Sequence, residues 1–209
     1  MSERSEREST ASTRRRLVVG LTGSSAPQLG LALLRALQGI EDVETHLVVS
    51  EGARLSLELE AGVTVAQVEA LADQSYSSSD LGAAISSGSF QAIGMVVMPC
   101  SMRTLAAVAT GLTSDLVSRA ADVALKERRT LVLVPRETPL NLVHLRNMET
   151  VTLAGAVVLP PMPAFYHRPR TIDDLLDHTV GKVLDQFAIQ HSLYRRWGGP
   201  GAEQEDGGG

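Results

Sequence analysis

The chain of 209 residues is long enough for one globular domain with a single buried core, and no second domain is expected. Its formal net charge of −5 argues against a general nucleic-acid surface, because neutralising phosphates requires clustered Lys and Arg. The single cysteine, Cys100, excludes an internal disulfide, and no stretch of about 18 apolar residues is present, so we expect a cytoplasmic protein with no membrane partner.

Apolar runs typical of buried strands alternate with segments of helical spacing. This alternation predicts a parallel, doubly wound sheet in a single α/β domain. In chain order we expect strand 17–19, helix 29–37, strand 44–50, helix 52–60, strand 92–98, helices 104–110 and 116–127, strand 130–134, helix 139–149, strand 155–159 and helix 172–189.

The polar segments between and outside these elements are expected at the surface. The Ser-rich stretch 74–89 is predicted to be a surface excursion, and the Pro-rich stretch 160–163 is predicted to be a rigid connector. Residues 1–15 and 198–209 are too polar and Gly-rich to bury, which predicts a disordered extension and a flexible tail. The folded domain is therefore expected to span 16–197.

Polar side chains follow the predicted strands at the points where the strands end. Open parallel sheets bind ligands beyond the carboxyl ends of their strands, so we expect these side chains to converge on one site. They are Gly23, Ser24, Ser25, Ser50, Ser101 to Thr104, Arg136, Glu137 and Tyr166.

Two of these strand ends have the composition of an anion site. The segment GLTGSSAPQLG places glycines and serines before a helix, where free backbone N–H groups favour a phosphate. It matches neither the GxGxxG fingerprint nor a P-loop, so a plain strand-to-helix turn is an equal alternative. Ser101 and Thr104 either meet a ligand or cap a helix, and capping is the commoner role.

Three further positions have both a chemical and a structural interpretation. Arg136 and Glu137 end a buried strand, where such a pair serves phosphate binding, proton transfer or a structural salt bridge. Cys100 is expected to be a buried filler, because no neighbouring base is apparent. His167 has no second ligand at a suitable spacing, so no metal site is expected.

Five segments between residues 16 and 197 carry a family resemblance. They are SGSFQAIGMVVMPCSMRTL, SRAADVALKERRTLVLVPRETPL, GAVVLPPMPAFYHRP, VLDQFAI and RRWG. Together they resemble the UbiX-type flavin prenyltransferases. The resemblance implies a flavodoxin-like or Rossmann-like homo-oligomer, often a dodecamer, with flavin sites near subunit interfaces.

The same resemblance implies a reaction. Dimethylallyl phosphate, or the diphosphate in some members, alkylates N5 of reduced FMN without a metal, and a fourth ring closes at C6. The product is prenylated FMN, which is released for a UbiD-type decarboxylase.

Roles for individual residues also follow from the resemblance. Proton handling is assigned to Ser25, Glu60 and Glu137, with a relay between Ser25 and Glu137 and with Glu60 near the flavin. The prenyl phosphate is assigned to Tyr166 and Lys182, and Lys126 and Arg119 supply further positive charge for its departure, so that Lys126 also counts as catalytic. The positions that hold FMN are Gly23, Ser24, Ser25, Ser50, Ser101, Met102, Arg103, Thr104 and Arg136.

Two positions depart from the family pattern. Ala26 follows Ser25 where the family has a glycine that permits positive φ and close backbone approach, and we expect Ala26 to narrow the pocket. Lys182 stands where Arg is common, which keeps the charge but loses the planar fork for phosphate.

Two other functions are consistent with parts of the sequence. An FMN-dependent decarboxylase of the peptidyl-cysteine or phosphopantothenoylcysteine type shares the core, but its catalytic histidine context and its PxMNxxMW-like stretch are missing. A non-catalytic carrier of FMN or prenylated FMN would bind flavin without transferring a prenyl group. A turnover assay separates the carrier from the enzyme.

Overall fold

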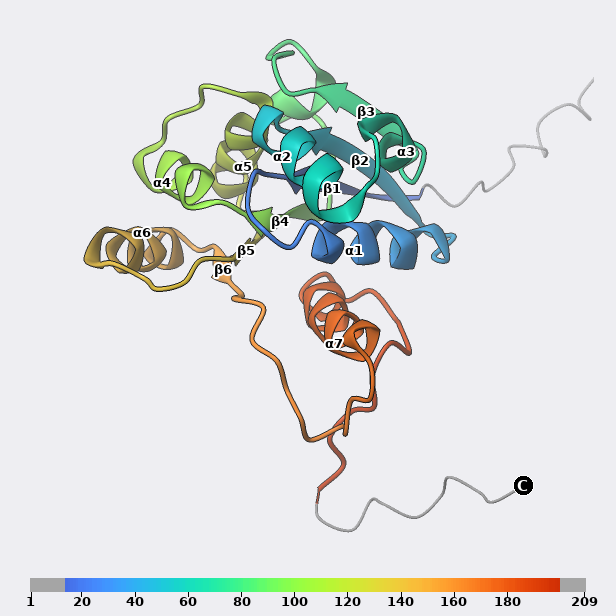
Figure 1. Cartoon of the computed structure of the whole chain (residues 1–209). Coiled ribbons are helices and arrows are strands. Elements are labelled where there is room, and N and C mark those ends of the chain that lie inside the picture. Colours follow the sequence, from blue (N-terminus) through green and yellow to red (C-terminus); the bar gives the residue numbers. More distant parts are fainter. Residues whose placement is uncertain (1–13, 200–209) are drawn as a thin grey trace, which may run out of the picture.

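A six-stranded parallel sheet runs through the computed structural model, which describes residues 14–199 (Figure 1). The strand order β3-β2-β1-β4-β5-β6 means that the chain moves from β1 to one edge, then returns past β1 to β4 and on to the other edge. This confirms the predicted doubly wound α/β domain. The strands are β1 Arg15–Leu21, β2 Val43–Val49, β3 Gln74–Ser77, β4 Gly94–Cys100, β5 Thr130–Pro135 and β6 Val157–Val158.

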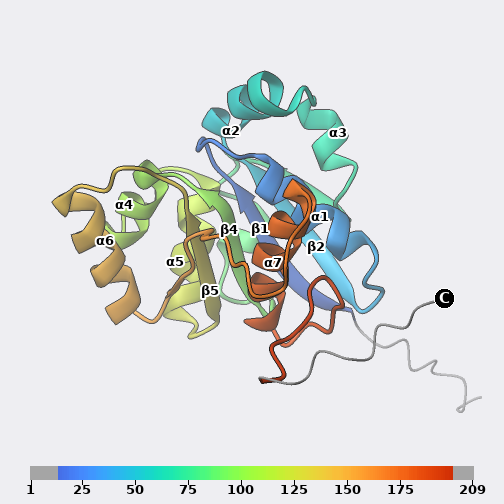
Figure 2. The same cartoon turned by 60° about the horizontal axis from the view of Figure 1, so that its bottom comes forward.

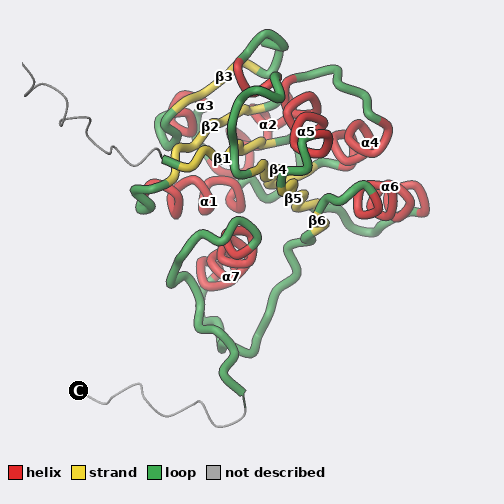
Figure 3. Tube along the Cα trace, turned by 180° about the vertical axis from the view of Figure 1, so that it is seen from behind, coloured by secondary structure: helices red, strands yellow, loops and turns green. Residues whose placement is uncertain are grey.

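Helices cover both faces of this sheet. α1 and α7 lie on one side of the strands and α5 on the other (Figure 3), while α4 packs beside α6 (Figure 2). None of the described helices is both long and apolar enough to cross a bilayer. The helices are α1 Gln28–Gln38, α2 Glu51–Ser56, the π-helical turn η1 Leu57–Ala61, α3 Val65–Glu69, the 3₁₀ turn η2 Ala84–Ser86, α4 Met102–Thr110, α5 Leu116–Lys126, α6 Leu142–Leu153 and α7 Ile172–Asp185.

Successive strand residues supply two apolar cores. Leu17 and Val19 of β1 belong to the core under α1 and α7, whereas Val18 belongs to the core under α5. Side chains alternate between the two faces of a strand, and helices cover both faces here. The central strands are therefore apolar throughout rather than alternating, which is why their positions could be predicted.

The Ser-rich stretch 74–89 lies mostly at the surface, as predicted, but the prediction missed that its first four residues form the strand β3 and that residues 84–86 form η2. β3 pairs only with β2, which places it at the edge of the sheet. Among its side chains only Tyr76 is half-buried, and an edge strand this polar has no apolar alternation for a sequence pattern to detect.

Several predicted element boundaries also change. The helix expected at 52–60 divides into α2 and η1, with Leu57 buried and Leu59 74% exposed. The helix expected at 139–149 begins after Asn141, whose side chain accepts a hydrogen bond from the His144 N–H at 3.0 Å. α7 ends at Asp185 rather than at residue 189. Parts of the predicted segments 1–15 and 198–209 lie outside the described residues.

The packing of α1 on the sheet generates a first prediction. A Cβ atom on Gly30 would lie 2.6 Å from the carbonyl oxygen of Met98 and 3.0 Å from Leu21, so Gly30→Ala forces the helix away from β4. We expect a loss of about 1–3 kcal/mol in the free energy of unfolding, measured by urea denaturation. Gly39→Ala is the control, because its nearest atom would be 3.6 Å away. Equal stability of the two variants would contradict the close packing.

Candidate functional site

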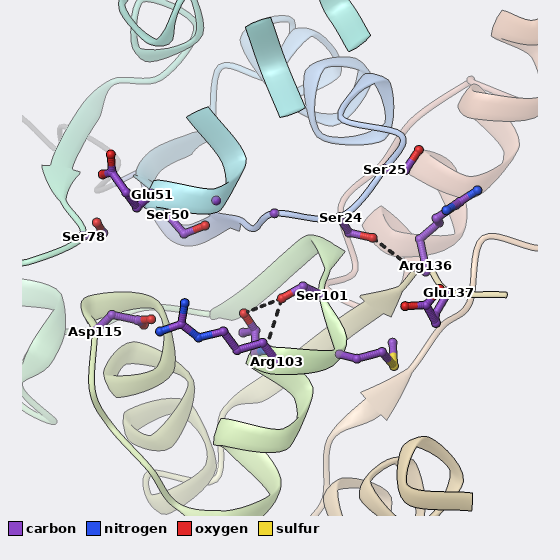
Figure 4. A pocket seen from close by; sticks show the side chains of 14 residues that line it. Ser24, Ser25, Ser50, Glu51, Ser78, Ser101, Arg103, Asp115, Arg136 and Glu137 are labelled. Carbon is purple, nitrogen blue, oxygen red and sulfur yellow. Dashed lines mark hydrogen bonds between the residues drawn. The ribbon is translucent and has the colours of Figure 1, made fainter. Parts of the chain in front are cut away.

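A cavity of about 530 Å³ opens at the carboxyl edge of the sheet, a size typical of small-molecule sites (Figure 4). It lies where the strand order reverses between β1 and β4. In the view of Figure 4, Glu51 and Ser78 lie at one end, and Ser25 and Arg136 lie at the other. The lining residues are Gly23, Ser24, Ser25, Ser50, Glu51, Gly52, Ser78, Ser101, Met102, Arg103, Thr104, Asp115, Arg136 and Glu137.

The loops around the cavity are joined by side-chain hydrogen bonds. The Thr22 hydroxyl donates to the Pro99 carbonyl at 2.8 Å and accepts from the Ser101 N–H at 2.7 Å. The Ser24 hydroxyl donates to the Arg136 carbonyl at 2.7 Å. The β1–α1 loop is thus attached both to the end of β4 and to the end of β5.

Three helices, α2, α4 and α5, begin at the wall of the cavity, and their N-cap residues are Ser50, Ser101 and Asp115. Ser50 caps α2 by accepting from the Ala53 N–H at 3.3 Å, and Ser101 caps α4 by accepting from the Thr104 N–H at 3.2 Å. Ser50 and Ser101 therefore cap helices and also line the cavity, so for Ser101 the predicted alternatives of helix capping and ligand contact do not exclude each other. The first-turn N–H groups of α4 favour an anion at this end of the cavity.

Two glycines allow the loops to approach each other. A Cβ atom on Gly23 would lie 2.8 Å from the Cα of Gly52, which is closer than two side chains permit. This contact brings the β1–α1 loop against the start of α2 and forms one wall of the cavity. Gly23 was predicted to belong to the site, from its place after the first strand and from the family resemblance, whereas Gly52 was not.

The charges of the cavity are mixed. The guanidinium groups of Arg103 and Arg136 form no ion pair with any residue between 14 and 199. The Glu137 carboxylate accepts from the Thr138 N–H at 2.9 Å, and Glu51 pairs with Arg54 at 3.2 Å. The two unpaired guanidinium groups can therefore meet an anionic ligand without first breaking a salt bridge.

Ser25 forms a hydrogen bond with Glu60 in the structure, whereas the relay predicted from the resemblance pairs Ser25 with Glu137. The Ser25 hydroxyl donates to the Glu60 Oε2 at 2.8 Å, and the Ala26 N–H donates to the same oxygen at 3.0 Å. These bonds, first from the Ala26 N–H and then from the Ser25 hydroxyl, lower the pKa of Glu60, which favours the ionised carboxylate. Ala26 has φ +71°, a region that costs about 1–2 kcal/mol for a residue with a Cβ. Ala26 itself does not line the cavity.

Four residues lining the cavity were not predicted from the sequence. Glu51 and Gly52 directly follow Ser50, so their place after the second strand could have identified them as site residues. Ser78 follows β3, a strand that was not expected. Asp115 is the N-cap of α5 and forms a capping box with Ser118, so its position just before an apolar helical segment could have identified it as a helix start.

Cys100 is fully buried, which raises the pKa of its thiol to about 12 and confirms its structural role.

Comparison with known proteins identifies the family. A family model described as Flavoprotein matches residues 5–196. A probable UbiX-like flavin prenyltransferase from Streptomyces sp. (strain D7) is 54% identical over 184 residues, which cover 88% of this chain and 92% of the relative. The chain belongs to the UbiX-like flavoprotein family. The resemblance of its motifs is thereby confirmed.

Two solved structures of UbiX-like proteins have the same fold. The crystal structure of AnUbiX (PadA1) in complex with FMN and dimethylallyl pyrophosphate is 52% identical, with a TM-score of 0.87 over 89% of this chain and 98% of that chain. The dodecameric FMN-dependent UbiX-like decarboxylase from Escherichia coli O157:H7 is 51% identical, with a TM-score of 0.85 over 88% of this chain and 100% of that chain.

Four residues that the resemblance assigns to the prenyl phosphate lie outside this cavity. The Tyr166 hydroxyl lies 3.2 Å from Nε2 of His178. Lys182 is 3.8 Å from Asp185. On α5, Arg119 donates to the Ser86 carbonyl at 3.1 Å and pairs with Asp122, and Lys126 pairs with Glu127. One copy of the chain therefore brings together the residues assigned to FMN, but not those assigned to the prenyl phosphate.

Asp185 attaches the C-terminal segment to α7. Its carboxylate accepts hydrogen bonds from the Tyr194 hydroxyl at 2.7 Å, from Arg196 at 2.6 Å and from His191 at 3.2 Å. Burial of the carboxyl opposes ionisation, but the bonds from Arg196, Tyr194 and His191 outweigh it and hold the pKa of Asp185 well below its usual range. The segment places Trp197 against the Tyr166 ring, with centroids 6.1 Å apart.

This cluster predicts a release of the segment in acid. A depressed carboxyl pKa contributes stability above the unfolded value of about 3.9, and the contribution is lost as the pH falls below it toward the folded pKa. Because Trp197 is the single tryptophan of the chain, its fluorescence anisotropy reports attachment of the segment. We expect constant anisotropy from neutral pH to about 4 and a decrease below that.

Asp185→Asn should lower the anisotropy of Trp197 already at neutral pH. Asp173→Asn, an exposed change in the first turn of α7, is the matched control and should behave as the unmodified protein. An Asp185→Asn variant with unchanged anisotropy across the pH range would show that this carboxylate does not hold the segment.

Proposed function

We propose that this chain transfers a dimethylallyl group to reduced FMN and produces prenylated FMN. The observation that carries the proposal is the cavity at the β1–β4 reversal, with the N-termini of α2, α4 and α5, its hydroxyl groups and its two unpaired guanidinium groups. A chain of 52% identity and the same fold binds FMN and dimethylallyl pyrophosphate together, which supports the assignment of both substrates.

The lining residues are chemically suited to FMN. We propose that the FMN phosphate binds where backbone N–H groups and the guanidinium groups of Arg103 or Arg136 are available. The hydroxyls of Ser24, Ser50 and Ser101 then orient the polar edges of the flavin. The full set of proposed FMN contacts is Gly23, Ser24, Ser25, Ser50, Ser101, Met102, Arg103, Thr104 and Arg136.

Neighbouring copies of the chain complete the site in this proposal. Asp115 lines the cavity at the start of α5, whereas Lys126 ends this helix, about 15 Å further along its axis. Lys126 is therefore proposed to serve the cavity of another copy, together with Arg119. We propose a dodecamer, as in the E. coli relative, and the exposed apolar residues of α6 supply a surface for assembly. These are Leu142, Val143, Leu145 and Leu153, which are 59%, 64%, 50% and 82% exposed.

The chemistry requires positive charge for the departing phosphate and a group that accepts a proton. Tyr166 and Lys182 are proposed to bind the prenyl phosphate with Lys126 and Arg119, so that preorganised cations replace a metal when the allylic C–O bond breaks. Alkylation releases the N5–H proton, and ring closure requires one proton for the prenyl double bond, so these two protons balance; C6 must then lose its own proton. Glu137 is proposed to accept the C6 proton in a relay with the Ser25 hydroxyl, which must turn from Glu60 toward Glu137 to pass its proton on.

The product is a modified cofactor, so another enzyme must use it. We propose a UbiD-type decarboxylase as the recipient and the cytoplasm as the compartment. The unpaired Cys100 is consistent with a reducing environment.

A turnover assay tests the proposed activity. Purified protein is incubated anaerobically with reduced FMN and dimethylallyl phosphate in the presence of a chelator, and the extracted flavin is analysed by mass spectrometry. We expect FMN with an added prenyl group. If neither the monophosphate nor the diphosphate yields this mass while FMN remains bound, the chain is a flavin carrier instead.

Replacement of Glu137 tests the proton acceptor. Glu137→Gln keeps the shape and hydrogen-bonding capacity of the side chain but cannot accept the proton, so we expect the rate of product formation to fall by about 10²–10⁴-fold while FMN still binds. Glu51→Gln, a carboxylate at the other end of the cavity, is the control. Full turnover by Glu137→Gln with bound flavin would remove Glu137 from the mechanism.

A further inference from the structure

His178 of α7 is surrounded by aromatic rings from two other segments of the chain. It is only 9% exposed, although its ring is polar. The ring of His167 stacks on it, with centroids 5.0 Å apart and 7° between the planes, and the Tyr194 ring packs against it at 4.8 Å. Tyr194 is itself fixed, because its hydroxyl donates to Asp185 at 2.7 Å. These contacts leave the imidazole of His178 little freedom to rotate.

The imidazole of His178 forms a hydrogen bond with a residue already assigned to the prenyl phosphate. Its Nε2 atom lies 3.2 Å from the hydroxyl of Tyr166, which belongs to the connector between β6 and α7. Tyr166 is 42% exposed, so part of its side chain remains open to a ligand. A phenol has one proton to donate and an oxygen that accepts, so the direction of this bond decides what else the hydroxyl can do.

The charge of the ligand determines which direction is useful. A fully ionised phosphate has only acceptor oxygens, so Tyr166 can bind it only by donating its O–H proton. That proton is free for the phosphate only where Nε2 of His178 carries an N–H and donates it to the phenol oxygen. Burial, followed by the charges of His167 and Lys182, lowers the pKa of His178, so the imidazole is neutral near pH 7 and can hold its single N–H on Nε2.

The helical spacing of α7 brings the two proposed phosphate ligands together. His178 and Lys182 are four residues apart, so they lie on the same face of the helix, about 6 Å apart along its axis. Tyr166 comes from a different segment, and its hydrogen bond to His178 places the phenol beside this face. Ring packing against His178 and Trp197 also holds the phenol, but it does not fix the direction of the O–H.

We propose that His178 is a positioning residue, whose Nε2–H donates to the Tyr166 oxygen and so directs the Tyr166 O–H, together with the Lys182 ammonium, toward the prenyl phosphate. The inference rests on the proposed function, because it takes this phosphate as the ligand of Tyr166 and Lys182. His178 acts through Tyr166 and does not itself touch the substrate. The donated bond also polarises the phenol and makes its O–H a stronger donor.

A double-mutant cycle on donor binding tests the link between the two residues. Dissociation constants of dimethylallyl phosphate are measured by calorimetry on the full chain saturated with oxidised FMN, whose N5 is not nucleophilic, so that no product forms. The proteins are the unmodified chain, His178→Leu, Tyr166→Phe and the double variant. We expect His178→Leu to weaken donor binding about tenfold, because the phenol is no longer oriented. In the Tyr166→Phe background the same change should cost about threefold or less. Equal losses in both backgrounds would overturn the proposal.

A conservative variant separates the hydrogen bond from the packing of the ring. His178→Gln keeps an N–H donor near the place of Nε2 but lacks the imidazole ring, as His178→Leu does. We expect His178→Gln to bind dimethylallyl phosphate within about threefold of the unmodified protein. If both variants bind it equally weakly, ring packing places Tyr166 and the proposal is wrong. A His178→Leu variant with unchanged donor binding would refute it as well.

A matched control and two further readouts complete the test. Asp177→Asn changes the preceding residue of α7, which lines a groove between α1 and α7, and donor binding should not change. FMN affinity, measured by flavin fluorescence, should be the same in all variants, since neither His178 nor Tyr166 lines the FMN cavity. Thermal unfolding shows whether each variant retains the fold.

The binding cycle also keeps this inference distinct from the proposed function. Donor binding by the unmodified protein that is not followed by prenylation of reduced FMN would contradict the proposed function, while the coupling of His178 with Tyr166 would still be measured. Absence of donor binding by the unmodified protein would contradict both.

Discussion

The hydrogen bonds of the buried Thr22 hydroxyl hold together the part of the fold on which the site depends. Thr22 is 2% exposed, and its hydroxyl is bonded both to the carbonyl of Pro99 and to the N–H of Ser101. A parallel sheet leaves its strand ends without a covalent link between neighbours, so hydrogen bonds must fix the loops that follow β1 and β4; the Thr22 hydroxyl adds two such bonds to the one from the Thr22 N–H to the Pro99 carbonyl at 3.2 Å. Because both bonds are made inside the protein, losing either one leaves a buried polar group unsatisfied. The hydroxyl thereby sets the separation of the two loops between which the cavity opens.

Much of the fold could be predicted because its central strands are buried on both faces. The mostly apolar segments 92–98 and 130–134 indicate strands that are buried on both faces. Because helical segments alternate with these strands, the sequence predicts a parallel sheet. β3 has no such apolar run, since all of its residues except the half-buried Tyr76 are exposed at the edge of the sheet. The π turn η1 that follows α2 could not be predicted either, because the spacing of apolar residues along a helix does not show where one extra residue is inserted.

The candidate site divides into a part that follows from local rules and a part that does not. Ser50 and Ser101 could be predicted, because they directly follow buried strands and cap the next helix. The contact between Ser25 and Glu60 joins residues 35 positions apart, and no local sequence pattern indicates it. The left-handed conformation of Ala26 contradicts local propensity, and its N–H donates to Glu60, which is distant in sequence.

The order of the strands also has a consequence for synthesis of the chain. β1 is central, but one of its two neighbours is β4, and the apolar core on one face of β1 is closed by Val183 and Leu184 of α7. In an emerging chain, α1 follows β1 at once, but the core that they share stays incomplete until α7 has left the ribosome. Contacts between such distant residues slow folding, and partly made chains with exposed strands aggregate. The need for chaperone protection is thus greatest before the last helix is translated.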